Sequence, residues 1–256
     1  MNRIEGFLKR IGMDPATQVE QTCAFLGRVQ TQCVLSIAYE NLDILNGKPL
    51  SLERDALYDK IVTRGRGGYC FELNGLLTHM LREMGFPVSE RFARFLRGET
   101  DVPMRRHRVA IVHLDDADYL CDIGVGQVAP RLPLKLQPGL VQTQNGETYK
   151  FERDPQHGWV LYDLHDGAWR QYISFTDDPQ YDVDFLQPSF FCEAHPASPF
   201  NKKPIIAIKT PEGRHTIDGR VYKVFEGEAL VHIEEDISDE RMHALLESAF
   251  KLTPEA

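Results

Sequence analysis

The chain has 256 residues, 42% of them hydrophobic and 26% charged, which supports a sizeable core in one large domain or two to three small ones. Its 29 Lys and Arg against 38 Asp and Glu give a net charge of -9, with no basic cluster that could follow nucleic acid or an anionic membrane. We therefore expect neither partner. No apolar run is long enough to cross a bilayer, and the N-terminus lacks a signal-peptide pattern. Five cysteines without a C-x-x-C pair predict reduced thiols in a cytoplasmic protein and no metal site.

Up to about residue 88 the apolar spacing is helical. A first helix near the N-terminus carries its apolar residues on one face: Ile4, Phe7, Leu8 and Ile11. A later run from Leu73 to Met84 repeats this spacing. We predict a helical bundle over residues 1–88.

After residue 88 the pattern changes to short alternating runs rich in Val, Ile, Phe and Tyr: RVAIVHL, YLCDIGV, YKFER, WVLYDL and WRQYISF. These runs predict an antiparallel β-barrel over residues 89–192. Beyond it, PIIAIKT, RHTID, RVYKVF and ALVHIE precede the helical run ISDERMHALLESAFKL. Residues 193–256 are therefore predicted to form a small antiparallel sheet with one helix, which makes the fold class α+β.

A glycine-rich turn precedes one cysteine, in the stretch GRGGYCFELN at residues 65–74. The spacing that begins at Leu73 places Cys70 in the first turn of a helix, where unpaired N–H groups and the helix dipole stabilise a thiolate. Arg64 and Arg66 are expected to add positive potential. Two interpretations remain open on this pattern: a small buried side chain, or an activated nucleophile.

An activated thiolate requires a base and a carboxylate that orients the base. His107 opens the predicted strand RHRVAIVHL, and Asp122 lies on the returning strand YLCDIGVG. A two-residue turn at 116–117 would pair Asp122 with Ile111 and leave His107 ~13 Å away, at about 3.3 Å per residue. Contact then requires a bulge, a longer loop at 115–118 or strong coiling.

Three segments together resemble the arylamine N-acetyltransferases: AYENLDI (38–44), RGRGGYCFELNGLL (64–77) and RHRVAIVHLDDADYLCDIGVG (106–126). FLKRIG near the start and HPASPF (195–200) extend the resemblance over most of the chain. It implies a helical bundle, a β-barrel and an α/β lid, the first two arranged as in cysteine proteases. It also implies a catalytic triad of Cys70, His107 and Asp122.

The family's chemistry implies acetyl-CoA as co-substrate, no metal, and an arylamine, arylhydrazine or hydrazide as acceptor. A ping-pong mechanism would pass the acetyl group through a thioester on Cys70. CoA would then leave before the amine attacks.

The resemblance also implies an acceptor pocket lined by four residues: Tyr39, Phe71, Val125 and Phe200. Val125 replaces an aromatic ring of the relatives, which implies a wider or reshaped pocket. Tyr39 stands where Phe is common and adds a hydroxyl. A simple core role is the alternative interpretation for the three aromatic residues.

Two further pairs take implied roles. Pro103 and Met104 resemble a strip that contacts pantetheine in relatives, and the neighbouring arginines at 105 and 106 are either solvated or close to CoA phosphates. Glu40 and Arg64 lie in family motifs and are expected to pair and brace the cysteine loop, since a buried charge needs an opposite partner.

Two other functions fit the same residues. A related acyltransferase or amide synthase, or an enzyme similar to proteases or transglutaminases, would keep the triad and use another acyl donor. A catalytically silent homologue would act as a binding protein. Acetylation by acetyl-CoA alone separates the arylamine N-acetyltransferase from both.

Overall fold

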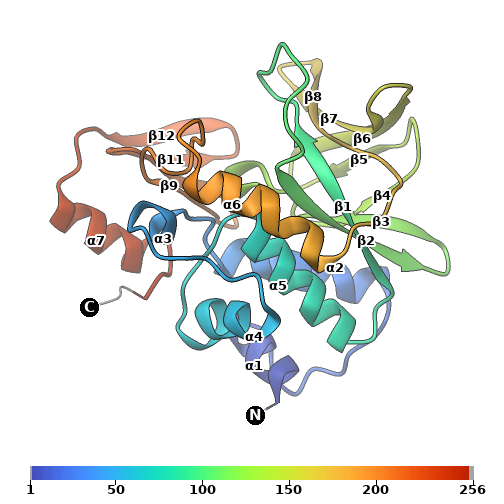
Figure 1. The fold of residues 1–256 in the computed structure, drawn as a ribbon, viewed down its shortest axis with the longest axis horizontal. Helices are drawn as coiled ribbons and strands as arrows, with labels where there is room; N and C mark the ends of the chain where they lie inside the picture. Colours follow the sequence, from blue (N-terminus) through green and yellow to red (C-terminus); the bar gives the residue numbers. More distant parts are fainter. Residues whose placement is uncertain (1, 254–256) are drawn as a thin grey trace.

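The computed structural model describes residues 2–253, and the chain begins with the predicted helices (Figure 1). Asn2 and Glu5 form a capping box at the start of the first helix, and its apolar residues Phe7 and Leu8 are fully buried. The helical elements are α1 (Arg3–Arg10), α2 (Cys23–Ser36), α3 (Leu42–Leu45), α4 (Arg54–Leu57), a π-helical turn η1 (Tyr58–Thr63) and α5 (Cys70–Glu83).

An antiparallel sheet of eight strands follows and curls into a nearly closed barrel, in the order β4-β3-β2-β1-β8-β7-β6-β5. The runs predicted as strands all contribute to it. Its strands are β1 (Val88–Phe95), β2 (His107–Leu114), β3 (Ala117–Cys121), β4 (Leu134–Lys135), β5 (Val141–Gln144), β6 (Glu147–Asp154), β7 (Gly158–His165) and β8 (Ala168–Phe175), with a 3-10 turn η2 (Gly126–Val128) after β3.

Strand β2 is buried on both faces, because it lies between the barrel interior and α5. Val109 and Ile111 pack into the barrel core, whereas the alternate residues Ala110 and Val112 pack into the core of the helical part. The strand that carries His107 is therefore held from two sides.

Two glutamines join the edge strands of the barrel. Gln142 accepts from Lys135 N at 2.8 Å, and its amide nitrogen donates to Lys135 O at 3.0 Å. Gln144 makes the same pair of hydrogen bonds to the backbone of Leu132. Each side-chain amide thus bonds to a backbone N–H and a backbone C=O that would otherwise be free to pair with another strand.

The last part of the chain is a four-stranded antiparallel sheet with the predicted helix packed on it. The sheet has the order β12-β11-β10-β9, formed by β9 (Ile205–Lys209), β10 (Gly213–Asp218), β11 (Val221–Glu226) and β12 (Ala229–Glu234), and α7 (Asp239–Ser248) follows. Their apolar residues form a core of their own.

Sequence analysis missed one helix, α6 (Leu186–Ala194), which follows a 3-10 turn η3 (Asp182–Phe185). Its segment LQPSFFCEA contains a proline and little amphipathic pattern, so tertiary contacts define it, among them Tyr69 Oη to Ser189 Oγ at 2.5 Å. Figure 1 shows α6 running between the last sheet and the barrel. Helix α6 crosses the predicted boundary between residues 89–192 and 193–256. The division into three domains stays a prediction, and so does the arrangement of the first two as in cysteine proteases.

Within residues 2–253, no helix combines the length and the apolar character that a membrane span requires.

Candidate active site

The loop before Cys70 passes so close to its neighbours that one position has no room for a side chain. A Cβ at Gly67 would lie 2.3 Å from the carbonyl oxygen of Ala38. On the same side, Glu40 N donates to Gly68 O at 2.9 Å. Helix α5 then begins at Cys70, as the apolar spacing predicts, and the cysteine is only 3% exposed.

The imidazole of His107 bonds to the carboxylate of Asp122, with Nε2 and Oδ2 2.7 Å apart, and both residues are buried. His107 lines the same cavity as Cys70. The sulfur of Cys70 lies 3.8 Å from the carbonyl oxygen of Arg106, the residue before His107. Because Nε2 is committed to Asp122, Nδ1 is the ring nitrogen that can exchange a proton with the thiol.

The contact between His107 and Asp122 arises from strand register. Residues 115–116 form the turn between β2 and β3, one position earlier than the sequence suggests, and Ala110 therefore pairs with Cys121. The two side chains are separated by two residues along the ladder instead of four, ~7 Å of strand at about 3.3 Å per residue. The ladder between β2 and β3 needs neither a bulge nor a longer loop.

Asn74 holds the carboxylate and was missed by sequence analysis. Its Nδ2 donates to Asp122 Oδ1 at 2.8 Å and to Arg108 O at 2.5 Å, and its Oδ1 accepts from Ile123 N at 2.9 Å. The signal was available, because Asn74 lies four residues after Cys70 and so on the same face of α5. Gly124 N donates to the same carboxylate oxygen, at 2.9 Å.

The surroundings of the sulfur favour the neutral thiol. Burial raises the pKa of the Cys70 thiol well above its ordinary value, and negative charge on Cys192 or Asp122 acts in the same direction. The backbone N–H of Phe71, in the first turn of α5, acts the other way. Ionisation of Cys70 therefore calls for a group that takes its proton, and His107 lines the same cavity.

The two arginines expected beside the sulfur are engaged elsewhere. Arg66 Nη2 lies 3.2 Å from Asp43 Oδ1 and 3.5 Å from Glu40 Oε1, while Arg64 Nε donates to Asp59 Oδ2 at 2.9 Å. The partner of Glu40 is thus Arg66, where the sequence suggests Arg64. Arg64, which is exposed and lies two residues earlier in the loop, pairs with the exposed carboxylate of Asp59 instead.

A buried network of charges braces the cysteine loop from below. Lys60 Nζ lies 2.7 Å from Asp43 Oδ2 and 2.8 Å from Glu72 Oε1, and Glu72 Oε2 accepts from Tyr69 N at 3.2 Å. Burial raises the pKa of Glu72 to about 6, against the effect of Lys60. The network fixes the start of α5, and therefore Cys70, to η1 and α3.

A cavity of about 670 Å³ opens at Cys70 and His107. Three of the four residues expected in an acceptor pocket line it: Tyr39, Val125 and Phe200. The fourth, Phe71, is fully buried in the core instead, where its ring lies 5.6 Å from that of Tyr69 and 6.1 Å from that of Phe185. Successive residues of an α-helix are about 100° apart, so Phe71 can face the core although Cys70, next to it in sequence, lines the cavity.

The strip before His107 lies beside this cavity. Met104 is 56% exposed and, with Arg105 and Arg106, lines a neighbouring groove of about 460 Å³, and Arg106 lines both spaces. Pro103 accepts a hydrogen bond from Arg94 through its carbonyl oxygen. A contact with pantetheine stays a prediction for both Pro103 and Met104.

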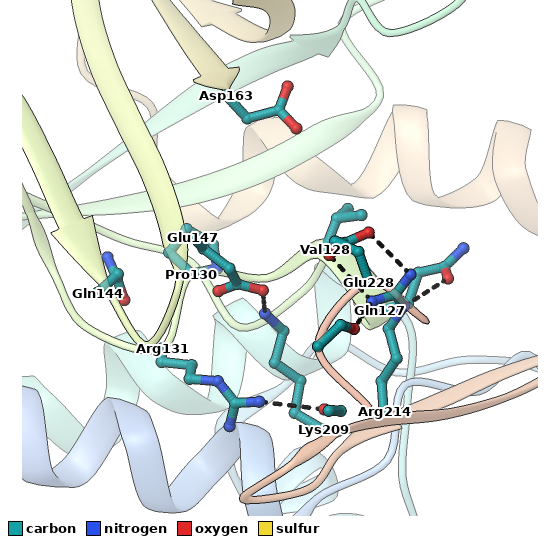
Figure 2. Close-up of polar contacts among 12 residues, drawn as sticks. Gln127, Val128, Pro130, Arg131, Gln144, Glu147, Asp163, Lys209, Arg214 and Glu228 are labelled. Atoms are coloured by element: carbon teal, nitrogen blue, oxygen red, sulfur yellow. Dashed lines mark hydrogen bonds and ion pairs between the residues drawn. The ribbon is translucent and has the colours of Figure 1, made fainter. Parts of the chain in front are cut away.

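The last sheet supplies one wall of the cavity, through residues of β9, β10 and β11 such as Ala207, Thr216 and Phe225. A polar seam fixes that sheet to the barrel (Figure 2). Lys209 pairs with Glu147, Arg131 Nη2 donates to Thr210 O at 2.7 Å, and Arg214 Nε donates to Gln127 Oε1 at 3.3 Å. Gln127 belongs to η2, which directly follows Val125.

Known proteins share this fold and these segments. A family model described as N-acetyltransferase matches residues 22–255. The chain is 32% identical over 247 residues to the arylamine N-acetyltransferase of Mycolicibacterium smegmatis, which covers 94% of this chain and 89% of that relative. The chain belongs to the arylamine N-acetyltransferase family.

Solved structures of the family share the fold of this chain. The arylamine N-acetyltransferase from Salmonella typhimurium matches with a TM-score of 0.93 at 26% identity, covering 98% of this chain and 92% of that chain. The Mycobacterium marinum arylamine N-acetyltransferase in complex with CoA matches with a TM-score of 0.90 at 29% identity. The match covers 97% of this chain and 92% of that chain. The resemblance drawn from the sequence motifs, and the α+β fold with a barrel that it implies, are thereby confirmed.

Asn74→Ala is expected to slow alkylation of Cys70 by iodoacetamide at neutral pH about tenfold or more, because Asp122 loses the donor that orients it toward His107. The rate of carbamidomethylation followed by mass spectrometry measures this. Gln30→Ala is the matched control, since Gln30 is also a buried amide and donates to Pro130 O at 2.9 Å. An Asn74→Ala protein that is destabilised like the control but alkylated at the wild-type rate would contradict the role of Asn74.

Glu72→Gln is expected to change the pH dependence of stability. Because the folded-state pKa of about 6 exceeds the ordinary 4.5, the contribution of Glu72 is complete below pH 4.5 and is lost as pH rises through 6. The loss amounts to about 2 kcal/mol. Between pH 4.5 and 7, the unfolding free energy of the variant relative to wild type should rise by this amount in urea titrations. A constant difference would refute the shift.

Proposed function

We propose that the protein transfers an acetyl group from acetyl-CoA to the nitrogen of an arylamine, arylhydrazine or hydrazide, through a thioester on Cys70. The observation that carries the proposal is a cysteine at a helix N-terminus that shares a cavity of about 670 Å³ with a buried His107–Asp122 pair, in a chain of this family. The three residues act as nucleophile, base and orienting carboxylate.

In the first half-reaction, His107 takes the proton of Cys70 and the thiolate attacks the acetyl carbon. The bond from carbon to Sγ forms and the bond from carbon to the CoA sulfur breaks. His107 gives its proton to the CoA sulfur, CoA leaves as the thiol, and His107 is neutral again. One thioester replaces another, so the acetyl group keeps its transfer potential. The buried Asp122 stabilises the imidazolium that exists during this step.

In the second half-reaction, the amine nitrogen attacks the acetyl carbon and the bond to Sγ breaks. An aromatic amine or hydrazide is largely unprotonated at neutral pH, so its lone pair is available without a separate base. His107 takes the proton that the nitrogen loses when the amide forms, and passes it to Cys70. The enzyme then returns to its starting state.

The acceptor is expected to bind between Tyr39, Val125 and Phe200, and the pantetheine arm beside Pro103 and Met104. The protein is expected to act in the cytoplasm on small molecules rather than on nucleic acid or membranes, in keeping with its net charge of -9. Its five cysteines all lie within the described residues and are free.

Incubation with acetyl-CoA alone tests the mechanism. One acetyl group should appear on the wild-type protein by intact mass spectrometry, and free CoA should be released before any amine is added. Cys70→Ser should remain unlabelled, and the matched control Cys23→Ser should label as wild type. Labelling of Cys70→Ser would refute the assigned role. A wild-type protein that neither labels nor releases CoA would favour another acyl donor or a silent homologue.

Val125→Phe tests the acceptor pocket. The larger ring is expected to narrow the cavity, so kcat/KM for a two-ring amine such as a naphthylamine should fall about tenfold relative to that for aniline. The ratio of the two kcat/KM values is the measurement. Val102→Phe makes the same change on an exposed side chain outside the lining and should leave the ratio unaltered. An unchanged ratio in Val125→Phe would remove Val125 from the pocket.

A further inference from the structure

Tyr39 stands where three parts of the chain meet next to the nucleophile. Its backbone pairs with Ala207 of β9, with Tyr39 N to Ala207 O at 2.8 Å and Ala207 N to Tyr39 O at 2.9 Å. The residues on either side of it bond to Gly68 of the cysteine loop. Its ring packs on Gly126, where a Cβ would lie 3.3 Å from Tyr39 Cγ. The side chain is thus held in one place, and it lines the cavity with Cys70.

The hydroxyl of Tyr39 has no hydrogen-bond partner among residues 2–253, although the side chain is only 8% exposed. By contrast, the buried Tyr69 and Tyr172 both bond through their hydroxyls, to Ser189 and to Val128 O. Tyr39 Oη is not sealed in the core as the unpartnered Thr78 Oγ1 is, so it can bond to a group that enters the cavity. The missing partner of Tyr39 is therefore expected among the groups that enter the cavity.

The hydroxyl also stays protonated in this place. Burial raises the pKa of the Tyr39 phenol well above its ordinary value, and negative charge on Cys70 raises it further. A Cβ at Gly124 would lie 2.9 Å from Cys70 Cα, and Gly126, two residues later, contacts the Tyr39 ring, so the ring lines the part of the cavity next to Cys70. A neutral O–H donor in the same cavity as Cys70 can donate to negative charge that develops there.

We propose that Tyr39 Oη donates a hydrogen bond to the oxyanion of the tetrahedral intermediate on Cys70, an inference that rests on the proposed function. When sulfur attacks the acetyl carbon, the carbonyl π electrons move to oxygen, and they return when the leaving group departs. The backbone N–H of Cys70, unpaired within α5 as the first of the helix, is the second donor. Tyr39 is thereby a catalytic residue in both half-reactions.

Tyr39→Phe removes only the hydroxyl and is the variant to test. In single-turnover mixing with saturating acetyl-CoA and no acceptor, the rate of acetyl-enzyme formation should fall about tenfold to 100-fold. The concentration of acetyl-CoA for half-maximal rate should stay within about twofold, because the interaction exists only in the transition state. Alkylation of Cys70 by iodoacetamide forms no oxyanion, so its rate and pH profile should match wild type.

Two controls make the outcome decisive. Tyr58→Phe removes a phenol hydroxyl that bonds to Arg3 O at 3.1 Å and lies outside the lining of the cavity, so it should leave acetylation unchanged. Acetylation of Tyr39→Phe at the wild-type rate would overturn the inference, and so would an equal loss in acetylation and alkylation, which would place the effect on the thiol. A wild-type protein that fails to acetylate would refute the proposed function itself.

Discussion

The hydrogen bond between His107 and Asp122 determines where the imidazole stands, and several parts of the fold serve to form it. The two-residue turn at 115–116 sets the register that brings the side chains together. Helix α5 contributes from the other side, because Asn74 holds the second oxygen of the carboxylate. Since the same helix begins with Cys70, one element positions both the proposed nucleophile and the side chain that holds Asp122.

Burial of the Cys70 thiol explains why the proposed mechanism requires His107 and Asp122. The sulfur lies in a region that disfavours its charge. Arg66 is bound to Asp43 of the loop's supporting network, and Arg64 is bound to the exposed Asp59. The network of Lys60, Asp43 and Glu72 stabilises the loop rather than the thiolate. In the proposed mechanism, the backbone N–H groups at the helix start and the imidazolium of His107 stabilise the anion.

Local patterns in the sequence predicted much of the fold. Apolar spacing located α1, α5 and α7, alternation located most strands, and the glycines before Cys70 placed it in the first turn of a helix. Family motifs then indicated the triad. Register could not be read this way, because a shift of one position in the turn changes the separation of His107 and Asp122 by two residues.

Residue-level contacts were the least predictable part. Glu40 could pair with either of two arginines two residues apart, and only the path of the loop selects Arg66. Phe71 adjoins the nucleophile in sequence, yet helical geometry turns it into the core. Helix α6 carries no clear periodic pattern, so tertiary contacts such as that of Ser189 with Tyr69 define it, and these could not be read from its composition.

The polar contacts in Figure 2 hold the final sheet beside the cavity that Cys70 lines. Because β9, β10 and β11 close one side of the cavity, a local opening of this sheet would uncover the sulfur while the barrel stayed intact. Lys209, Arg131 and Arg214 hold the sheet by polar contacts, in addition to apolar packing of Ile205 and Ala38. Resistance of the thiol to oxidation would then depend on the stability of a segment more than a hundred residues away in sequence.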